Sequence, residues 1–211
     1  MHGVFVAPHA LRYGLFGFIV GVMLSQNTND RNALRAFTAL ASTTGMDPRR
    51  VLELGVDGVE DLIRVAGLAR QRAERIIGLA RMFIEGRLGD WICRLGVEEA
   101  RRLLLSIKGV GEKTADLVLL MYCRLPAFPI DTHIRRVSSR ISIGGSYSTI
   151  RRSFLEVLND VEELIAVHVK LISIGRLFCK PKRPRCSECP LRECCSYAAE
   201  RGGDSCSKKG G

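Results

Sequence analysis

A lysine and an aspartate near the middle of the chain have the residue types and settings that covalent chemistry needs. Lys113 stands in the first turn of a predicted helix over 112–123, where the positive end of the helix dipole disfavours a charged ammonium. With partial burial, a neutral amine becomes available there as a nucleophile. Asp131 precedes a predicted helix over 132–141, so we interpret it as an N-cap whose carboxylate can also face a cleft. Taken singly, Lys113 is more often a solvated surface residue and Asp131 only a cap.

The glycines before Lys113 indicate a tight reversal between two short helices. Gly109 and Gly111 bracket Val110, and glycines at alternate positions allow positive φ with no side chain projecting from the backbone. The N–H groups exposed at the start of the second helix suit an anion, such as a nucleic-acid phosphate. An ordinary helix-turn-helix whose glycines only make the turn is an equally good interpretation of this short pattern.

Four cysteines near the C-terminus have the spacing C-x6-C-x2-C-x5-C, which can enclose one soft metal centre: Cys179, Cys186, Cys189 and Cys195. Zinc is the simplest choice, but structural zinc sites usually pair two C-x2-C knuckles across a longer gap. The bacterial ferredoxin spacing is also absent. Because Cys93 and Cys123 stand apart from this group, we expect a metal site in a reducing cell rather than a disulfide framework.

The composition favours a globular protein with a polyanionic partner. The chain has 211 residues, a net charge of +10 and 46% hydrophobic residues. Such a surplus of positive charge promotes association with phosphates, but it does not by itself separate nucleic acid from an acidic membrane. The apolar run 14–24 is too short to span a bilayer and no small-residue cleavage site follows it, so we interpret it as a buried helix.

Apolar residues recur at helical spacing along the chain, which predicts an all-α protein. Asp47 and Pro48 mark a clear helix start, and Ser148 is the expected cap of a later helix. The predicted helices cover 13–25, 30–42, 48–54, 59–66, 70–85, 97–106, 112–123, 132–141, 149–159 and 161–177.

Together these features resemble the helix-hairpin-helix and Gly/Pro-Asp motif of the base-excision DNA glycosylases, with Lys113 placing the chain nearest the endonuclease III family. The matching residues are Gly109, Val110, Gly111, Lys113, Thr114 and Ala115, followed by Asp131, Thr132, His133, Ile134, Arg136 and Val137. The resemblance implies that the hairpin holds the DNA backbone, Lys113 attacks C1′ of the damaged nucleotide, and Asp131 assists proton transfer and stabilises positive charge. One departure is Lys108, where the family commonly has proline.

The resemblance also implies the domain organisation and the cofactor. A six-helix barrel would span 15–124, with the hairpin at about 103–123. A discontinuous helical domain of 1–14 and 125–197 would carry a 4Fe-4S cluster, and 198–211 would be a disordered tail. The family spacing selects Cys195 rather than Cys194 as the last ligand. We expect the cluster to pin a basic loop that presents its side chains to phosphates: Lys182, Arg183 and Arg185.

Two further segments resemble the family's DNA-inserting loops. Residues 24–30 follow an apolar helix, and an uncharged amide, Gln26 or Asn27, would fill the gap left by a flipped base. Which of the two enters is open. Leu68 would be the apolar wedge of the second loop. The neighbouring Arg70, Arg72 and Arg75 bind phosphate or form a solvated helix face, and Asn29 and Asp30 are candidate caps of the next helix.

The resemblance implies a bifunctional DNA glycosylase and AP lyase that removes oxidised pyrimidines, such as thymine glycol, from duplex DNA through a lysine Schiff base and β-elimination. We expect a cytoplasmic monomer that associates with the nucleoid through damaged double-stranded DNA and has no membrane partner. A monofunctional mismatch glycosylase for uracil, thymine or adenine is the alternative, although those that carry the cluster generally lack the lysine. A non-catalytic DNA-binding module is a further alternative.

Overall fold

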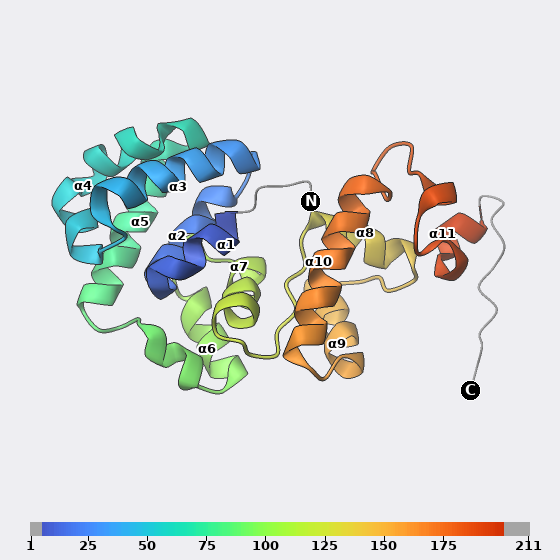
Figure 1. The fold of residues 1–211 in the computed structure, drawn as a ribbon. Helices are drawn as coiled ribbons and strands as arrows, with labels where there is room; N and C mark the ends of the chain where they lie inside the picture. The colour runs from blue at the N-terminus through green and yellow to red at the C-terminus, as the bar shows by residue number, and fades with distance from the viewer. Residues whose placement is uncertain (1–5, 201–211) are drawn as a thin grey trace. The chain divides into compact units, whose positions relative to one another are not determined.

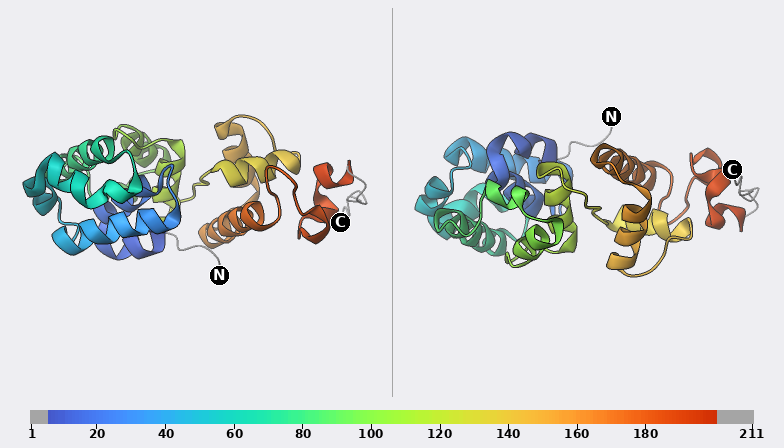
Figure 2. Two further views of the ribbon diagram at one scale, coloured as in Figure 1. Left: turned by 90° about the horizontal axis from the view of Figure 1, so that it is seen from above. Right: turned by 90° about the horizontal axis from the view of Figure 1, so that it is seen from below.

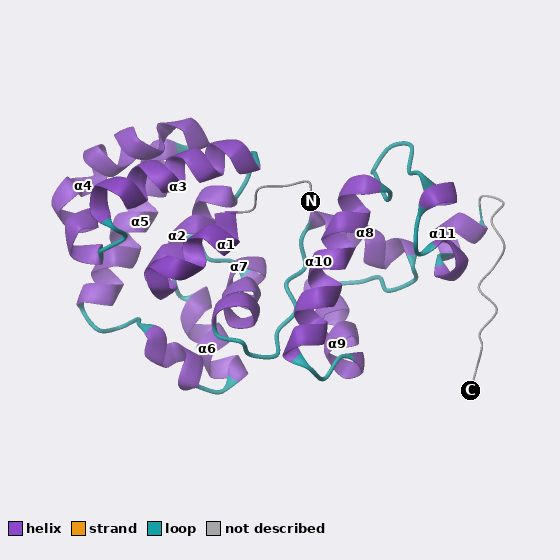
Figure 3. Cartoon of the chain, viewed as in Figure 1, coloured by secondary structure: helices purple, strands orange, loops and turns teal. Residues whose placement is uncertain are grey.

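The computed structural model describes residues 6–200, and every regular element in that range is helical (Figures 1 and 3). The predicted all-α class is therefore confirmed. The chain forms two compact units, Met1–Leu125 and Pro126–Gly211. The predicted division placed residues 1–14 with the second domain, whereas α1 (Val6–Ala10) packs against α2 in the first unit. The two divisions differ for this segment.

The first unit is built from short helices joined by tight turns. After α1 come the 3₁₀ turn η1 (Leu11–Tyr13), α2 (Gly14–Ser25), α3 (Asp30–Thr44), α4 (Pro48–Ile63), η2 (Arg64–Ala66), α5 (Ala69–Ile84), η3 (Asp90–Arg94), α6 (Val97–Leu105), α7 (Glu112–Leu117) and the π-helical turn η4 (Val118–Tyr122). The predicted helix over 112–123 thus changes from α to π geometry part of the way along.

Helix α2 forms the centre of the first unit, with α1, α3 and α5 packed against it (Figure 1). It is apolar on all sides, and every residue from Leu15 to Leu24 is buried. A helix of this composition is stable only inside a protein core. Gly21 brings α1 close, since a Cβ there would lie 2.8 Å from the Cβ of Ala10. The interpretation of 14–24 as a buried helix is confirmed. Within residues 6–200, no helix is long and apolar enough to cross a membrane.

Local sequence signals explain the helix boundaries. Asp47 caps α4 by accepting a hydrogen bond from the Arg49 N–H at 2.8 Å, as predicted. Of the two candidate caps of α3, Asn29 is the N-cap, with its side chain accepting from the Asn32 N–H, and Asp30 is the first helical residue. The break predicted between 54 and 59 occurs at Gly55, whose φ of 66° interrupts α4.

The second unit contains α8 (Thr132–Arg140), α9 (Tyr147–Val157), α10 (Val161–Leu177), the turns η5 (Cys186–Glu188) and η6 (Arg192–Cys194), and α11 (Ser196–Ala199). Helices α8 and α10 lie side by side in every view (Figure 2). Phe128 stacks on Phe154 from α9, with ring centroids 4.2 Å apart, and the edge of His168 from α10 completes this core.

Two predicted boundaries in the second unit are wrong. The cap of α9 is Ser146, which accepts from the Thr149 N–H, so the helix begins earlier than the predicted cap Ser148 allows. The predicted disordered tail over 198–211 begins inside α11, where Ala198 is buried. The rest of that tail, 201–211, lies outside the described residues.

Candidate functional site

The hairpin between α6 and α7 has the predicted reversal, but only one of its glycines needs a left-handed backbone. Gly109 has a φ of 94°, a conformation that side-chain-bearing residues rarely adopt. Gly111 has a φ of −97° and is the N-cap of α7, so the expectation of positive φ there is wrong. A Cβ at Gly111 would meet nothing within 4 Å, which leaves the first N–H groups of α7 open. Val110 is buried, so only its backbone can face a ligand.

A buried ion pair holds the two helices of the hairpin together. Arg101 on α6 donates to Asp116 on α7, whose side chain is 0% exposed, and to Glu112 at the start of α7. Burial acts to lower the pKa of Arg101, but the hydrogen bonds and charges of Asp116 and Glu112 outweigh it and raise that pKa. This pair was not predictable from the sequence, because its members are joined only once the hairpin has folded.

Lys113 is an exposed residue in the first turn of α7. We expected partial burial of its amine, and the described residues do not provide it. The next residue, Thr114, is 3% exposed and points into the first unit, where its hydroxyl oxygen accepts a hydrogen bond from Gln26. The lysine is therefore presented at the surface of the hairpin, while its neighbour anchors the helix.

The two predicted amide residues occupy different environments. Gln26 is half-buried, and its Nε2 donates to the Gly109 carbonyl at 3.1 Å and to the Thr114 hydroxyl at 3.2 Å. Asn27 is exposed and has a φ of 52°. Leu68, in the second predicted loop, is 63% exposed with a φ of 50°. Of the two amides, only Asn27 is left exposed.

The three arginines that follow Leu68 have three different roles. Arg70 is exposed and forms ion pairs with acidic residues of α4 and α5: Asp57, Glu60 and Glu74. Arg72 is buried and donates to backbone carbonyls at the end of α2. The side chain of Arg75 lies under the hairpin, because a Cβ at Gly109 would be 2.6 Å from its Cδ. The interpretation of these arginines as one phosphate-binding or solvated face is wrong for Arg72.

The far end of the hairpin is fastened to η3. Cys123, just after η4, forms a disulfide with Cys93, and their Cα atoms lie 4.8 Å apart. The hydroxyl of Tyr122 donates to Asp90 at 2.7 Å, and burial followed by this hydrogen bond raises the pKa of Tyr122. The expectation of a reducing environment in place of disulfides is wrong for this pair, because two isolated cysteines 30 residues apart carry no recognisable spacing.

In the second unit, Asp131 is the N-cap of α8, as predicted. Its Oδ1 accepts from the Ile134 N–H at 2.7 Å, and the residue is only half-buried. His133 packs against α10, where a Cβ at Gly175 would lie 2.7 Å from the Cβ of His133, and its Nδ1 lies 3.1 Å from an Arg136 nitrogen. The capped helix is thus fixed firmly in its unit, with one carboxylate oxygen committed to the cap.

Four thiols line one small cavity of about 20 Å³: those of Cys179, Cys186, Cys189 and Cys195. Cys194 is exposed and does not line it. Burial raises the pKa of the Cys189 thiol, and the charges of the other three thiols raise it further. In the described part of the chain, no three Cys, His, Asp or Glu side chains are grouped to hold one metal ion.

Arg140 connects α8 to this cysteine segment. Its Nη1 donates to the Cys179 Sγ at 3.2 Å and to the Lys180 carbonyl at 2.9 Å. Its guanidinium also lies 4.4 Å from the centre of the Tyr197 ring. In the basic loop that follows, Lys182 and Arg183 are exposed, whereas Arg185 forms an ion pair with Glu188 at 2.8 Å.

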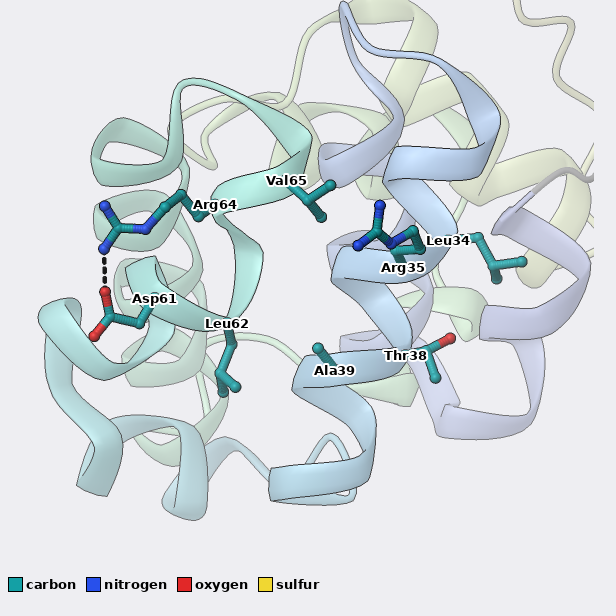
Figure 4. Close-up of a pocket in the computed structure, with 8 residues that line it drawn as sticks. All are labelled: Leu34, Arg35, Thr38, Ala39, Asp61, Leu62, Arg64 and Val65. Carbon is teal, nitrogen blue, oxygen red and sulfur yellow. Dashed lines mark hydrogen bonds and ion pairs between the residues drawn. The ribbon is translucent and has the colours of Figure 1, made fainter.

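A hollow of about 810 Å³ lies elsewhere in the first unit (Figure 4). It is lined by residues of α3, α4 and η2: Leu34, Arg35, Thr38, Ala39, Asp61, Leu62, Arg64 and Val65. An ion pair between Asp61 and Arg64 stands on one side of it. None of the predicted site residues lines this hollow.

Known proteins match most of the chain in sequence. The family model of the HhH-GPD superfamily base excision DNA repair protein matches residues 20–160. Endonuclease III of Sulfolobus acidocaldarius is 38% identical over 187 residues, which cover 87% of this chain and 82% of that protein. Endonuclease III of Escherichia coli strain K12 is 34% identical over 184 residues, covering 86% of this chain and 83% of the relative.

Solved structures match the fold. An endonuclease III trapped as a covalent intermediate with DNA has a TM-score of 0.76 at 28% identity, and the match covers 89% of this chain and 86% of that one. A thermostable thymine-DNA glycosylase has a TM-score of 0.72 at 22% identity, which shows a shared fold alone. The chain therefore belongs to the HhH-GPD superfamily of base excision DNA repair proteins and, within it, to the endonuclease III family.

Proposed function

We propose oxidised pyrimidines in duplex DNA as the substrate class of this base excision repair enzyme, a DNA glycosylase with AP lyase activity. The observation that carries the proposal is the lysine at the start of the second hairpin helix, Lys113. A lysine there supplies a nucleophile for both base release and strand cleavage. The solved endonuclease III trapped as a covalent intermediate with DNA supports a covalent step.

The proposed reaction begins with attack of the Lys113 amine on C1′, which breaks the glycosidic bond and releases the base. Opening of the sugar then gives a Schiff base between the lysine and C1′. Loss of a proton from C2′ expels the 3′ phosphate by β-elimination, and water releases the lysine. One oxygen of Asp131 accepts the capping hydrogen bond of α8. We assign the other carboxylate oxygen to proton transfer and to stabilising positive charge on the sugar.

Lys113 is exposed at the start of α7. DNA that covers the hairpin would exclude water from its amine. We therefore propose that bound DNA completes the environment in which the amine is reactive.

The hairpin and the cysteine segment supply the proposed contacts to the DNA backbone. A Cβ at Gly111 would meet nothing, so a phosphate can approach the first N–H groups of α7 closely, and Lys108 adds an exposed positive charge beside them. The four cysteines line one cavity, and we propose that they bind a 4Fe-4S cluster, which would hold the loop in shape. Lys182 and Arg183 would then face phosphates from that loop.

Reduction with borohydride tests the proposed chemistry, because it converts the Schiff base into a stable adduct between protein and DNA. We expect the wild-type protein to be trapped on a thymine-glycol duplex and Lys113→Gln to be neither trapped nor active as a lyase. Lys170→Gln, which removes another exposed lysine from α10, is the matched control and should be trapped normally. Full lyase activity in Lys113→Gln would refute the assignment.

A panel of duplexes tests the substrate class. Cleavage of thymine-glycol DNA in preference to uracil or thymine mismatches supports oxidised pyrimidines. Release of mismatched bases without strand cleavage would instead favour the monofunctional mismatch glycosylase. We also propose that the enzyme acts as a monomer on double-stranded DNA in the cytoplasm, and sedimentation of the complex with one duplex tests the stoichiometry.

A further inference from the structure

Arg72 is a buried cation with an unusual set of partners. It is 4% exposed, and its guanidinium donates to the Met23 and Leu24 carbonyls at 2.7 Å each and to the Gln26 carbonyl. Among the described residues, no carboxylate forms an ion pair with it. Burying a charge without an opposite charge is costly unless its hydrogen bonds are well satisfied. A buried arginine at this position therefore needs a structural reason.

The end of α2 supplies that reason. The last carbonyls of a helix have no partners within the helix and carry its partial negative charge. At Gln26 the chain leaves α2 with a ψ of 129°, and Asn27 follows with a φ of 52°. The Met23 carbonyl accepts a long bond from the Gln26 N–H at 3.4 Å, and Arg72 on α5 is a further donor to it and to the Leu24 and Gln26 carbonyls. These bonds tie the end of α2 to α5.

The same residue is linked to the second loop through its backbone. The Arg72 N–H donates to the Leu68 carbonyl at 3.0 Å, which closes the first turn of α5. Leu68 itself is in a left-handed conformation and is 63% exposed. Any residue at position 72 would make this backbone bond. It places Arg72 one helical turn after Leu68, so the arginine that binds the end of α2 projects from the turn of α5 that follows the second loop.

Gln26 extends this network to the hairpin. While its carbonyl accepts from Arg72, its side chain donates to the Gly109 carbonyl and to the Thr114 hydroxyl. An amide that makes two hydrogen bonds inside the first unit would have to break both to enter a duplex. Asn27, the next residue, is exposed, and its side chain makes no such bond to the part of the chain that the structure describes.

This inference rests on the proposed function. We propose that Arg72 is a positioning residue, which holds the turns at 26–27 and 67–68 and the hairpin in one arrangement. In that arrangement Asn27 and Leu68 together fill the space of the flipped nucleotide. Gln26 is part of the support and not the inserting side chain. The arrangement exists before DNA binds. The conformational entropy of the two loops is therefore lost when the protein folds and does not weaken DNA binding.

The test compares two substrates of the same enzyme. Removal of a damaged base from a duplex needs the inserting side chains, whereas Schiff-base trapping at an abasic site in single-stranded DNA needs the catalytic residues but not the inserting ones. Arg72→Lys keeps the charge but cannot reach three carbonyls at once. We expect it to lower the single-turnover rate of base release by about tenfold or more while leaving trapping at the single-stranded abasic site nearly unchanged. Arg70→Lys, on the exposed side of the same helix, is the matched control.

A fluorescent base placed opposite the lesion reports insertion directly. 2-Aminopurine brightens when it loses its stacking partners, and we expect Asn27→Ala and Arg72→Lys to reduce that signal, but Gln26→Ala to reduce it less than Asn27→Ala. Equal losses of base release and abasic trapping in Arg72→Lys would make Arg72 a general stabiliser and overturn the proposal. A signal lost with Gln26→Ala and kept with Asn27→Ala would also overturn it.

Hydrogen exchange of the DNA-free wild-type protein keeps the proposal testable even if Arg72→Lys does not fold. Slow exchange at the Gln26 amide, which donates to the Met23 carbonyl, is expected when Arg72 holds this turn, and exchange as fast as in an unstructured peptide would contradict it. Failure of the proposed function has a different signature, since the wild-type protein itself would then not be trapped on abasic DNA.

Discussion

The Nε of Arg101 donates to the Oδ1 of Asp116 across 2.9 Å, and this bond joins the two helices of the hairpin. Asp116 is fully buried, and Arg101 also reaches the exposed Glu112 at the start of α7. The shape of the hairpin, which we propose contacts DNA, therefore depends on a partly buried charge cluster.

Removal of one member of this pair should be strongly destabilising. Asp116→Ala leaves the Arg101 cation half-buried without its main partner, and we expect a loss of about 3–5 kcal/mol in the free energy of unfolding. Urea denaturation measures it. Glu112→Gln, which removes only the more exposed partner, is the matched control and should cost less than about 1 kcal/mol. Similar losses from the two variants would show that burial of the pair is unimportant.

Local signals were enough to predict most of the fold. Helix α10 has the predicted bounds of 161–177, and Asp47 and Asp131 are caps as predicted, because periodicity and capping are encoded within a few residues. The all-α class followed from the same periodicity. The hairpin was also recognisable from its glycines, although only Gly109 needs the special backbone conformation.

Interactions between distant residues were not predictable in this way. Arg70 and Arg72 look alike in the sequence, yet one is exposed and the other is buried, because the partners of Arg72 are more than forty residues away along the chain. Gln26 meets Gly109 and Thr114 across even longer separations. Such partners are brought together by the packing of α2 against α5 and α7, which no local pattern encodes.

Reduction of the disulfide between Cys93 and Cys123 should lower the stability of the first unit. The bond closes a loop of 30 residues, and the chain-entropy model gives a stabilisation of about 3–4 kcal/mol for such a loop. We expect Cys93→Ser to lower the melting temperature of the protein measured without reductant. Addition of a thiol reductant should lower that of the wild-type protein to the same level.

The control for the disulfide is reductant added to Cys93→Ser itself. If the effect of reductant acts through this bond, the variant should show no further change. A further fall would mean that the reductant acts elsewhere, for example on the cysteine segment. Disulfides are rare in most cytosolic proteins but common in those of hyperthermophilic archaea. Alkylation of the unreduced protein measures whether this disulfide forms in the cell.

Asp131→Asn should separate catalysis from helix capping. Asparagine caps helices about as well as aspartate, so α8 should remain intact and DNA affinity should change little. The amide cannot accept a proton as the carboxylate does, and we expect turnover to fall by about 10²–10⁴-fold. Single-turnover cleavage together with a binding titration measures both properties.

A second capping aspartate provides the matched control. Asp47 caps α4 with the same kind of bond, and Asp47→Asn should affect neither turnover nor affinity. If Asp131→Asn loses affinity or stability and keeps its turnover, the carboxylate has a structural role only.

The cysteine segment should control the salt dependence of DNA binding. Lys182 and Arg183 are exposed in the basic loop, while Arg185 already pairs with Glu188. If the first two face phosphates, Lys182→Ala and Arg183→Ala should each reduce the slope of log affinity against log salt by about one. Arg185→Ala should have a smaller effect, because its charge is partly neutralised by Glu188.

Removal of the proposed cluster should resemble loss of these two contacts together. Without a group to hold the four thiols around their cavity, the basic loop should lose its shape, and affinity for duplex DNA should fall even where circular dichroism shows that the helices remain. Cys194→Ser is the matched control, since this thiol does not line the cavity. Iron-free, folded protein with undiminished affinity and an unchanged salt slope would show that the loop neither depends on the cluster nor contacts phosphate.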